Sequence, residues 1–311
     1  MSDLPRVGIV ICTLDRCEAV LRALSGLAGQ VYPPDRIGVW VHDDGSGDDT
    51  PRAVPGFLSG LKEKGFYAAA FHVSDARRGI AHARNITAAK AMAASDLVLF
   101  LDDDVILDKD CVAGLSGYIM ENPKTGVVAP RMIRSDDGEL LHGAYFVDWL
   151  TFTYRMKDGR DPLPCDWLDP ACLMATPGVI ETIGGFWPGY YRSHEGVDFC
   201  LRAKRAGCGV VYLPAASAVH IMRQERLSPE RVYYVIRNKF TLIRRNGSAL
   251  HRWLLIPLLA AAGLPKYIFE SFMRNGWTAP REMGFILKAV VHGLLGRTGP
   301  LQPSSEEARR R

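Results

Sequence analysis

Three consecutive aspartates, Asp102, Asp103 and Asp104, directly follow the apolar run LVLFL, which has the length and composition of a buried strand. Carboxylates about 5 Å apart repel each other by about 3 kcal/mol at an effective dielectric constant of about 20, so the triplet is costly unless cations balance it. Mg²⁺ and Mn²⁺ prefer oxygen ligands and often join carboxylates to substrate phosphates. The triplet therefore predicts a divalent metal site. Acids that cap the next helix are the alternative, although a cap needs only one carboxylate.

Two further acidic motifs follow apolar runs nearer the amino terminus. Asp15 lies in VICTLDR, and Asp43 and Asp44 lie in VHDDGSGDDT. The Gly-Ser-Gly turn lets the backbone approach a ligand closely, and carboxylates can accept hydrogen bonds from a base or a ribose. The turn lacks the third glycine of a dinucleotide fingerprint. It is a weak signal by itself, and a helix cap is the alternative.

Arginines gather in the segment DARRGIAHARN, which places Arg77, Arg78 and Arg84 around Gly79. Guanidinium groups beside a carboxylate and metal site suit a diphosphate ligand. A solvent-facing helix is the alternative.

The elements that must position these residues alternate in kind over residues 6–104: short β-rich runs are followed by longer amphipathic ones. This alternation is typical of βα units on a mainly parallel sheet. Ligands of such sheets bind at the carboxyl ends of the strands, which is where the acidic motifs stand. We therefore expect an α/β fold with a mainly parallel, nucleotide-binding sheet flanked by helices.

The rest of the chain changes character twice. After Cys111 it consists of short mixed segments rich in Trp, Pro and Gly, which favour a substrate-binding half. Past His220 it becomes helical, and one helix is expected to begin with Ser228 as its N-cap and to stop at Gly247. The last dozen residues have the composition of a disordered tail.

Composition excludes several classes of protein. A chain of 311 residues with 48% hydrophobic residues can bury a globular core. Seven cysteines without a CxxC pair argue against a disulfide framework and a zinc knuckle, and favour a reducing cytoplasm. The amino terminus lacks the pattern of a secretion signal. The run WLLIPLLAAAGL is shorter than the about 20 residues that span a bilayer, and Pro257 interrupts it, so we expect no transmembrane helix.

Charge divides the chain. Residues 1–200 hold 19 Lys and Arg against 28 Asp and Glu, whereas residues 201–311 hold 19 against 6. A basic rear part suggests an anionic partner, either phospholipid or nucleic acid. Solvated helix faces are the alternative.

Taken together, VGIVICTLDR, VHDDGSGDDT, RRGIAHARN, LFLDDDV, SHEGVDFCLRAKRAG and VVYLPAASAVH resemble the family-2 glycosyltransferases of the GT-A fold, in order and spacing over about residues 6–245. The resemblance implies a metal-dependent inverting glycosyltransferase that moves a hexosyl or deoxyhexosyl group from a UDP- or dTDP-linked donor to a hydroxyl. We expect a catalytic domain over residues 1–222, with the nucleotide-sugar half at about 1–105 and the acceptor half at 106–222. Residues 223–311 would form a basic helical region.

The resemblance also implies the site residues. The donor would be bound by Thr13, Asp15, Asp44, Gly79, Arg84, Asp102 and Asp103. Mn²⁺ or Mg²⁺ would be held by Asp102 and Asp104, the outer acids of the family's DxD motif, and by His220. A satisfied histidine at a strand end is the alternative for His220.

The general base is where this chain departs from the family. Members commonly read Glu-Asp-x-Asp at the start of the helix that corresponds to HEGVDFCLRAKRAG, with the second acid as base, and that position is Gly196 here. Inversion requires a carboxylate that removes the proton of the acceptor hydroxyl. Glu195 is the first candidate, Asp198 the second and Asp169 in WLDPAC the third. A first-turn acid that interacts with the helix dipole is the alternative for Asp198.

The carboxyl-terminal helices combine apolar faces with basic side chains, which suits a bilayer interface. The expected apolar residues are Trp253, Leu254, Leu255, Leu258, Leu259, Phe285, Ile286, Val290 and Leu294, and the expected basic ones are Arg237, Lys239, Arg244, Arg245, Arg252, Lys266 and Lys288. We expect a cytoplasmic protein, peripheral on the inner membrane surface, whose acceptor is a saccharide of the cell envelope or a lipid-linked one. Packing of these helices on the catalytic domain, or on a second subunit in a homodimer, is the alternative.

Two other functions stay open. Gly196 is compatible with a catalytically impaired sugar-nucleotide-binding protein, and the acidic sheet edge is compatible with a nucleotidyltransferase. We expect no nucleic-acid binding, because the front of the chain is acidic and holds no known binding module.

Overall fold

The structure, a computed structural model, describes residues 4–221, 228–275 and 279–301. These residues form two compact units. The first contains residues 4–186 and 196–221, and the second contains residues 187–195 together with the described residues from 228 onward. Residues 187–195 are thus grouped with the carboxyl-terminal helices, and the domain bounds expected from the sequence stay predictions.

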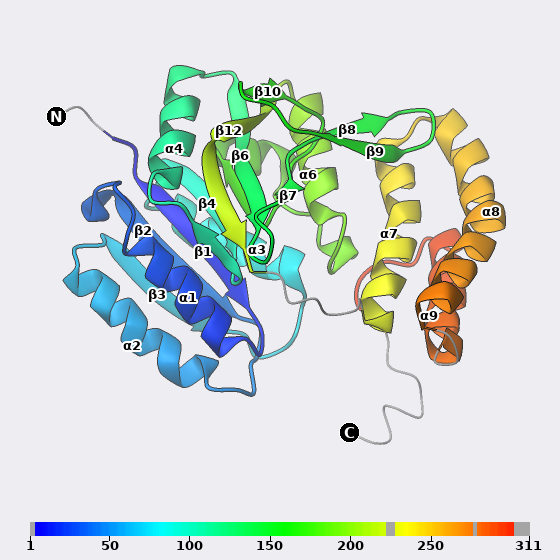
Figure 1. Ribbon diagram of the computed structural model, residues 1–311, viewed down its shortest axis with the longest axis horizontal. Coiled ribbons are helices and arrows are strands. Elements are labelled where there is room, and N and C mark those ends of the chain that lie inside the picture. The colour runs from blue at the N-terminus through cyan, green and yellow to red at the C-terminus, as the bar shows by residue number, and fades with distance from the viewer. Residues whose placement is uncertain (1–3, 222–227, 276–278, 302–311) are drawn as a thin grey trace. The chain divides into compact units, whose positions relative to one another are not determined.

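The first unit is built on one large sheet. Ten strands of the described chain pair in the order β10-β12-β6-β11-β4-β1-β2-β3, with β5 beside β12 and β7 beside β6 (Figure 1). Their bounds are β1 Val7–Thr13, β2 Ile37–Asp43, β3 Ala68–Val73, β4 Leu97–Asp102, β5 Val105–Leu107, β6 Thr125–Arg134, β7 Leu140–His142, β10 Leu163–Pro164, β11 Cys172–Ala175 and β12 Gly209–His220. A separate ribbon pairs β8, Ala144–Asp148, with β9, Thr153–Lys157.

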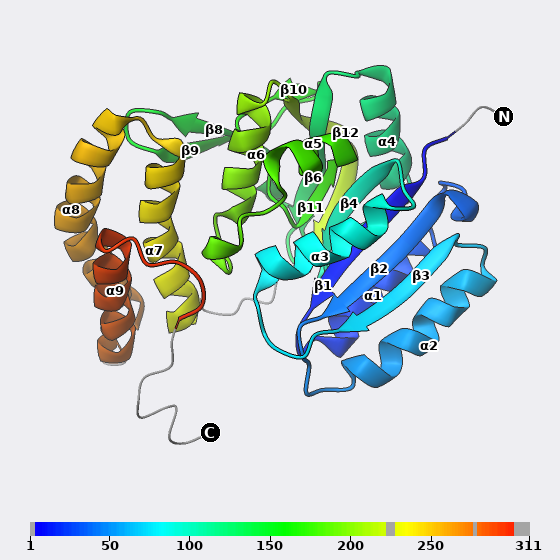
Figure 2. The same cartoon turned by 180° about the vertical axis from the view of Figure 1, so that it is seen from behind.

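Helices cover both faces of the parallel half of this sheet, in which β4, β1, β2 and β3 run in the same direction. Figure 1 shows α1 and α2 on one face, and Figure 2 shows α3 on the other. The helices up to residue 205 are α1 Cys17–Leu27, α2 Thr50–Glu63, α3 Ile80–Met92, α4 Cys111–Glu121, α5 Pro177–Ile183 and α6 Glu195–Arg205, and single 3-10 turns occupy Pro34–Arg36 and Pro188–Tyr190. The expected α/β fold, a sheet of nucleotide-binding type flanked by helices, is confirmed. Its half formed by β4, β1, β2 and β3 is parallel as expected, whereas β11 pairs antiparallel with both β4 and β6.

The core explains why the strands read as unbroken apolar runs. All seven residues of β1 and of β2 are buried, because helices cover the sheet on both sides. Alternate residues, such as Ile9 and Ile11 of β1 and Leu99 and Leu101 of β4, join one hydrophobic cluster with α1 and α2. This cluster fixes the register that brings the strand ends together.

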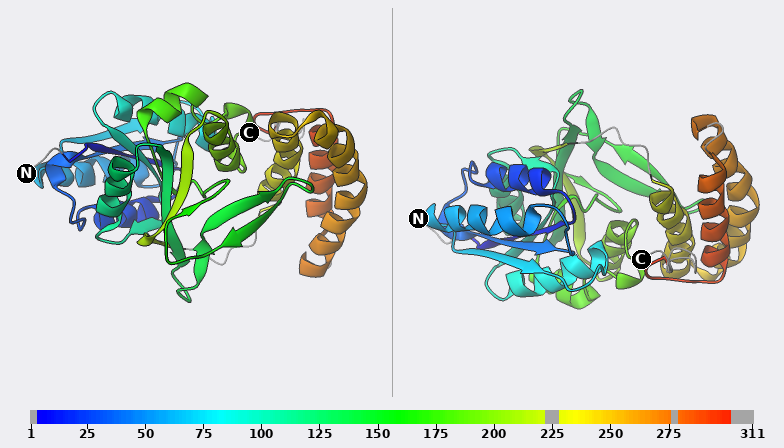
Figure 3. Two further views of the ribbon diagram at one scale, coloured as in Figure 1. Left: turned by 90° about the horizontal axis from the view of Figure 1, so that it is seen from above. Right: turned by 90° about the horizontal axis from the view of Figure 1, so that it is seen from below.

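The second unit contains three long helices, α7 Pro229–Asn246, α8 Ala249–Asn275 and α9 Ala279–Leu294, and Figure 3 shows α8 and α9 side by side. The hydroxyl of Ser228 accepts a hydrogen bond from the Arg231 backbone N–H, and α7 ends at Gly247, so both expected helix signals are confirmed.

The sequence predicted that Pro257 interrupts an apolar run too short to span a bilayer. The helix that contains this run is longer than predicted. Helix α8 continues through Pro257 and Pro265. A proline removes one backbone hydrogen bond and bends the helix, and packing of α8 against α7 and α9 offsets that cost. The segment Ala249–Phe269 therefore has the length and apolar composition of a membrane span, and 6% of its most apolar window is buried. Length and composition alone carry this finding.

Candidate active site

The carboxyl ends of three parallel strands meet at one edge of the sheet. The register pairs Thr13 at the end of β1 with Asp43 at the end of β2, and it pairs Cys12 with Asp102 at the end of β4. The acidic motifs of the sequence therefore lie at neighbouring strand ends, which is the position where open α/β sheets bind ligands.

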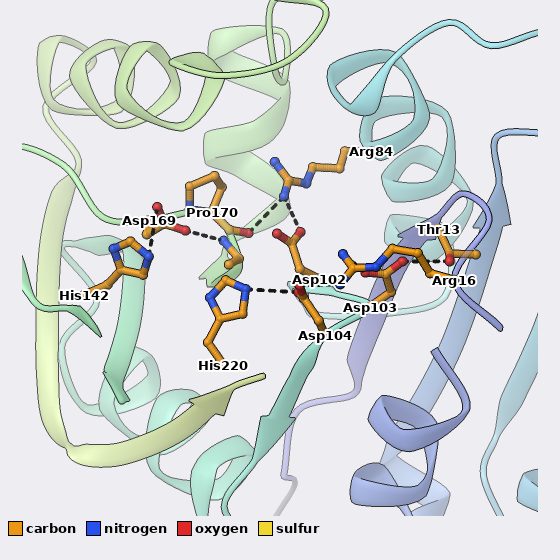
Figure 4. Close-up of polar contacts among 11 residues, drawn as sticks. Thr13, Arg16, Arg84, Asp102, Asp103, Asp104, His142, Asp169, Pro170 and His220 are labelled. Carbon is orange, nitrogen blue, oxygen red and sulfur yellow. Dashed lines mark hydrogen bonds and ion pairs between the residues drawn. The ribbon is translucent and has the colours of Figure 1, made fainter. Parts of the chain in front are cut away.

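Protein cations balance the aspartate triplet (Figure 4). The Arg84 guanidinium lies 2.5 Å from Oδ1 of Asp102. Arg16, in the loop after β1, lies 3.0 Å from Oδ1 of Asp103 and 2.8 Å from Oδ2 of Asp104. Repulsion within the triplet is thus offset without a metal ion, so the costly charges that motivated the metal prediction do not by themselves require one.

The middle acid of the triplet has a structural bond. The Thr13 hydroxyl donates a hydrogen bond of 2.7 Å to Oδ2 of Asp103, and this pair joins the ends of β1 and β4. Burial raises the pKa of Asp103 to about 7, although Arg16 and the Thr13 hydrogen bond both oppose the shift. Thr13 and Asp103, both expected in the donor site, are therefore in direct contact with each other.

The last acid of the triplet contacts the end of β12. Nε2 of His220 lies 3.1 Å from Oδ1 of Asp104. Burial lowers the pKa of His220, but the hydrogen bond and charge of Asp104 outweigh burial and raise it. Burial raises the pKa of Asp104, but His220 and Arg16 together outweigh burial, so the pKa of Asp104 is lowered. Both shifts favour the protonated form of His220 and the ionised form of Asp104.

The expected metal ligands fit a divalent ion in part. Within the described residues, no three His, Cys, Asp or Glu side chains already enclose a metal position. Asp104 and His220 are in contact, Asp102 is half-buried beside them, and Nδ1 of His220 is buried without a hydrogen-bond partner in the described chain. Two carboxylates and an imidazole are donors that Mn²⁺ accepts, and phosphate oxygens commonly complete such sites.

The loops after β1 and β2 are fixed to each other. Asp15 accepts a 2.7 Å hydrogen bond from the Gly47 N–H, and its own N–H donates to the Ser46 hydroxyl. Asp15 has a φ of 54°, in the left-handed region. The buried Asp44 accepts hydrogen bonds from the backbone N–H groups of Arg78 and Gly79, at 3.2 Å and 3.3 Å.

The start of α3 is therefore positioned by the end of β2. Gly79, the N-cap of α3, has a φ of 87°, which favours glycine. Arg84, one turn into the helix, is buried and reaches the triplet. The expected donor residues of β1, β2, α3 and β4 thus surround one sheet edge, and their roles in donor binding stay predictions.

The two first candidates for the general base differ in their surroundings. Asp198 is completely buried, and its Oδ2 lies 2.7 Å from Nε of Arg202. Arg202 in turn donates hydrogen bonds to the backbone carbonyls of Ile183 and Gly185, so the pair fastens α6 to the end of α5. Glu195 is buried and falls in the second unit. Both assignments stay predictions.

Two residues at this edge, Arg16 and His142, were not predicted from the sequence. A third, Asp169, was predicted only as the third candidate for the general base. Arg16 directly follows Asp15, and that position was the only signal for it. His142, at the end of β7, had no motif at all, and its Nε2 lies 3.7 Å from Oδ2 of Asp169. Figure 4 shows Asp169 and His142 on the same side of the triplet as His220.

The comparison with protein families decides the class. Residues 8–178, more than half of the chain, match the family described as Glycosyl transferase family 2. The chain belongs to this family. It is a glycosyltransferase, and the resemblance drawn from its motifs is confirmed.

Similar proteins include two curated rhamnosyltransferases. The chain is 23% identical to "Rhamnosyltransferase WbbL" of Escherichia coli (strain K12) over 52% of this chain and 68% of the relative. It is 25% identical to the "N-acetylglucosaminyl-diphospho-decaprenol L-rhamnosyltransferase" of Mycobacterium tuberculosis (strain H37Rv), over 71% of this chain and 76% of the relative. Among solved structures, "GalNAc-T7 with UDP, GalNAc and Mn2+" matches with a TM-score of 0.63 at 15% identity, over 78% of this chain. The chain spans about half, 48%, of that structure's length, and the likeness shows the GT-A fold alone.

Proposed function

We propose that this family-2 glycosyltransferase moves a deoxyhexosyl or hexosyl group, with inversion, from a UDP- or dTDP-linked donor to a hydroxyl of a lipid-linked saccharide of the cell envelope. The observation that carries the proposal is the convergence of Arg84–Asp102, Arg16–Asp104 and Asp104–His220 at the carboxyl edge of the parallel strands. Two similar proteins, both named as rhamnosyltransferases and one for a decaprenol-linked sugar, support the choice of sugar and acceptor.

Different residues of the site would bind different parts of the donor. Asp15 and Asp44, held by the backbone of neighbouring loops, would bind the ribose and the base. The guanidinium groups of Arg84 and Arg16 would turn from the triplet carboxylates toward the donor diphosphate, because guanidinium binds phosphate and carboxylate oxygens in similar geometry. A Mn²⁺ or Mg²⁺ ion held by Asp102, Asp104 and His220 would supply charge stabilisation for the departing diphosphate.

Donor binding tests this assignment. UDP- and dTDP-sugars, each with Mn²⁺ or Mg²⁺, are screened for a rise in melting temperature, since a ligand at 100 times its Kd stabilises the native state by about 2.7 kcal/mol. We expect a metal-dependent rise with at least one donor. The rise should disappear in Asp104→Ala and persist in Asp161→Ala, which removes an exposed aspartate of the loop between β9 and β10. Equal rises in both variants would place the donor elsewhere.

Product analysis separates the competing functions. A glycosyltransferase releases the nucleoside diphosphate, whereas a nucleotidyltransferase releases pyrophosphate. A catalytically impaired binding protein would show the rise in melting temperature and release neither product. Release of UDP or dTDP together with a glycosylated acceptor is the expected result.

We further propose that the second unit contacts the inner membrane surface through α8. Exposed apolar side chains recur at helical spacing along it: Leu250, Trp253, Leu254, Leu258, Phe269 and Met273. Trp253 is 80% exposed. An apolar hollow of about 530 Å³ opens between α8 and α9, lined by Leu264, Pro265, Ile268, Phe269 and Met283. An exposed apolar helix face beside cationic side chains suits a bilayer interface.

The structure corrects which side chains can take part. Of the expected basic residues, Arg237 is buried and Arg244 donates hydrogen bonds to carbonyls of Gly293 and Leu294. Ile286 and Val290 of α9, expected on the apolar face, are buried in the unit. Arg252 and Lys266 on α8 are exposed and can reach lipid phosphates.

Flotation with anionic liposomes at low salt tests the contact. We expect the wild-type protein to float, and Leu254→Glu/Leu258→Glu to remain in the dense fraction. Met120→Glu, which adds a charge at an exposed apolar position of α4, is the matched control and should float like the wild type. Failure of the wild type to float would remove membrane contact from the proposal. A homodimer interface on the same face stays a prediction, and light scattering would report it.

A further inference from the structure

The ring of Pro170 occupies the space that a side chain at position 196, the place of the family's usual general base, would need. A Cβ atom added at Gly196 would lie 2.5 Å from Cδ and 2.6 Å from Cγ of Pro170, closer than real Cβ contacts. Gly196 is buried at the start of α6, so an aspartate at this position would require Pro170 to move. An acid at position 196 is therefore incompatible with the present packing against the segment that contains Asp169 and Pro170.

This segment is held beside the triplet by backbone hydrogen bonds. The Asp102 N–H donates a hydrogen bond of 2.8 Å to the Ala171 carbonyl. The Pro170 carbonyl accepts a hydrogen bond from Arg84 at 3.4 Å, and β11, which follows at once, pairs with β4. The residue just before the proline thus has a fixed place next to the expected donor site.

Asp169 carries a carboxylate to that place. Its Oδ1 accepts a 3.0 Å hydrogen bond from the Ala171 N–H, which orients the group, and 23% of its side chain is exposed. The pKa of Asp102 is raised mainly by burial, and the negative charges of Asp104 and Asp169 raise it further. The positive charges of Arg84 and His220 oppose this rise. Oδ2 of Asp169 faces Nε2 of His142 at 3.7 Å. Asp169 is thus close to the triplet, oriented and open to solvent, whereas Asp198 is fully buried against Arg202.

We propose that Asp169 is the general base of this glycosyltransferase and replaces the acid that position 196 cannot hold. This inference rests on the proposed function. The Asp169 carboxylate accepts the proton of the acceptor hydroxyl while the hydroxyl oxygen forms a bond to the anomeric carbon. The bond from that carbon to the donor phosphate oxygen breaks, and its electron pair leaves with the nucleoside diphosphate. The protonated Asp169 then releases its proton to solvent through its exposed edge.

A pair of variants tests the role. Asp169→Asn keeps the shape and the acceptor for the Ala171 N–H but cannot take a proton, so kcat should fall at least 100-fold. Asp169→Glu keeps a carboxylate and should retain at least tenfold more transfer than Asp169→Asn. The donor-induced rise in melting temperature should be the same in both variants and the wild type. Transfer by Asp169→Asn within threefold of the wild type, or equal loss in both variants, would overturn the assignment.

A second experiment transfers the carboxylate from position 169 to position 196, where the family commonly has its general base. In Asp169→Asn/Pro170→Gly/Gly196→Asp the ring that blocks position 196 is gone, and we expect at least tenfold more transfer than in Asp169→Asn alone. Asp169→Asn/Gly196→Asp, which retains the ring, should show no such recovery, and equal recovery would overturn the steric argument. Absence of transfer by the wild type with every donor would overturn the proposed function and this assignment together. Transfer by the wild type and by Asp169→Asn alike would overturn the assignment alone.

Discussion

The Arg84 guanidinium and the Asp102 carboxylate form an ion pair of 2.5 Å at the end of β4. Arg84 is 3% exposed, and its guanidinium also lies 5.3 Å from the centre of the Phe186 ring. The Asp102 side chain is 31% exposed, so removing Arg84 would leave a half-buried carboxylate that keeps part of its desolvation cost without its partner.

Arg84→Met should therefore destabilise the protein by about 1 to 3 kcal/mol, between the cost of breaking an exposed pair and a buried one, because it leaves the half-buried Asp102 with less compensation. Arg84→Met/Asp102→Asn should recover at least half of that loss, since the unpaired charge is then gone. The free energy of unfolding in denaturant measures both. As the control, Arg134→Met removes an exposed, solvent-screened ion pair with Asp137 and should cost much less than Arg84→Met. Additive losses in the double variant would contradict the pairing.

Position 196 allows a packing test that is independent of activity. Gly196→Ala should destabilise the first unit by about 1 to 3 kcal/mol, because the new methyl group overlaps the Pro170 ring. In the Pro170→Gly background the same change should be close to neutral. Gly178→Ala, in a helix position with open space around it, should be neutral or slightly stabilising. If Gly196→Ala behaves like Gly178→Ala in thermal unfolding, the two segments are not packed as described.

His42 predicts a loss of stability in acid. Both of its ring nitrogens are buried without a hydrogen-bond partner in the described residues. Burial lowers its pKa from 6.5 to about 4; His72 and Lys90 add to the lowering, and Asp44 and Asp43 oppose it. Because the native pKa lies below the unfolded one, the native state binds fewer protons between these values. The stability that His42 contributes is complete above pH 6.5 and is lost as the pH falls toward about 4.

The size of this effect is on the order of 3 kcal/mol over that interval. His42→Phe, which cannot take a proton, should flatten the dependence of the unfolding free energy on pH between 6.5 and about 4. Phe71→Leu, which changes a half-buried side chain of the neighbouring strand β3 that cannot titrate, is the control and should leave the slope unchanged. An unchanged slope in His42→Phe would refute the assignment of the acid sensitivity to this residue.

Asn238 holds the segment of residues 187–195 within the second unit. Its Nδ2 donates hydrogen bonds to the carbonyls of Tyr190, Arg192 and Ser193, at 3.0, 2.6 and 2.9 Å. Tyr191, between them, has a φ of 64°, in the left-handed region that bulky residues avoid. The hydrogen bonds thus maintain a strained turn just before α6.

Asn238→Asp keeps the size of the side chain but replaces the donor by a carboxylate that repels the three carbonyls. We expect a destabilisation of about 2 to 4 kcal/mol and faster hydrogen exchange of residues 187–195. Asn122→Asp, at the end of α4, loses one bond to the Tyr118 carbonyl in the first unit and is the matched control. Unchanged exchange of this segment in Asn238→Asp would show that other contacts hold the turn.

Much of the fold could be predicted from local patterns. The apolar runs of β1 and β4, the acids that follow them and the Ser228 cap depend on residues close in sequence, so the chain itself displays them. Helix α8 was predicted less well, because whether a helix continues through Pro257 depends on what packs against it, and no local pattern contains that information.

The sequence by itself determined the class of this protein: acids at the ends of parallel strands, in the order and spacing of family 2. Only the tertiary structure decided how their charges are balanced, by Arg16 and Arg84, and which carboxylate can stand beside them. The sequence shows that position 196 is a glycine where the family commonly has an acid. It does not show that the ring of Pro170, 26 positions earlier in the chain, occupies the space of a side chain at this position. Excluded volume and charge compensation act between residues that are close in space, and the chain order does not record those distances.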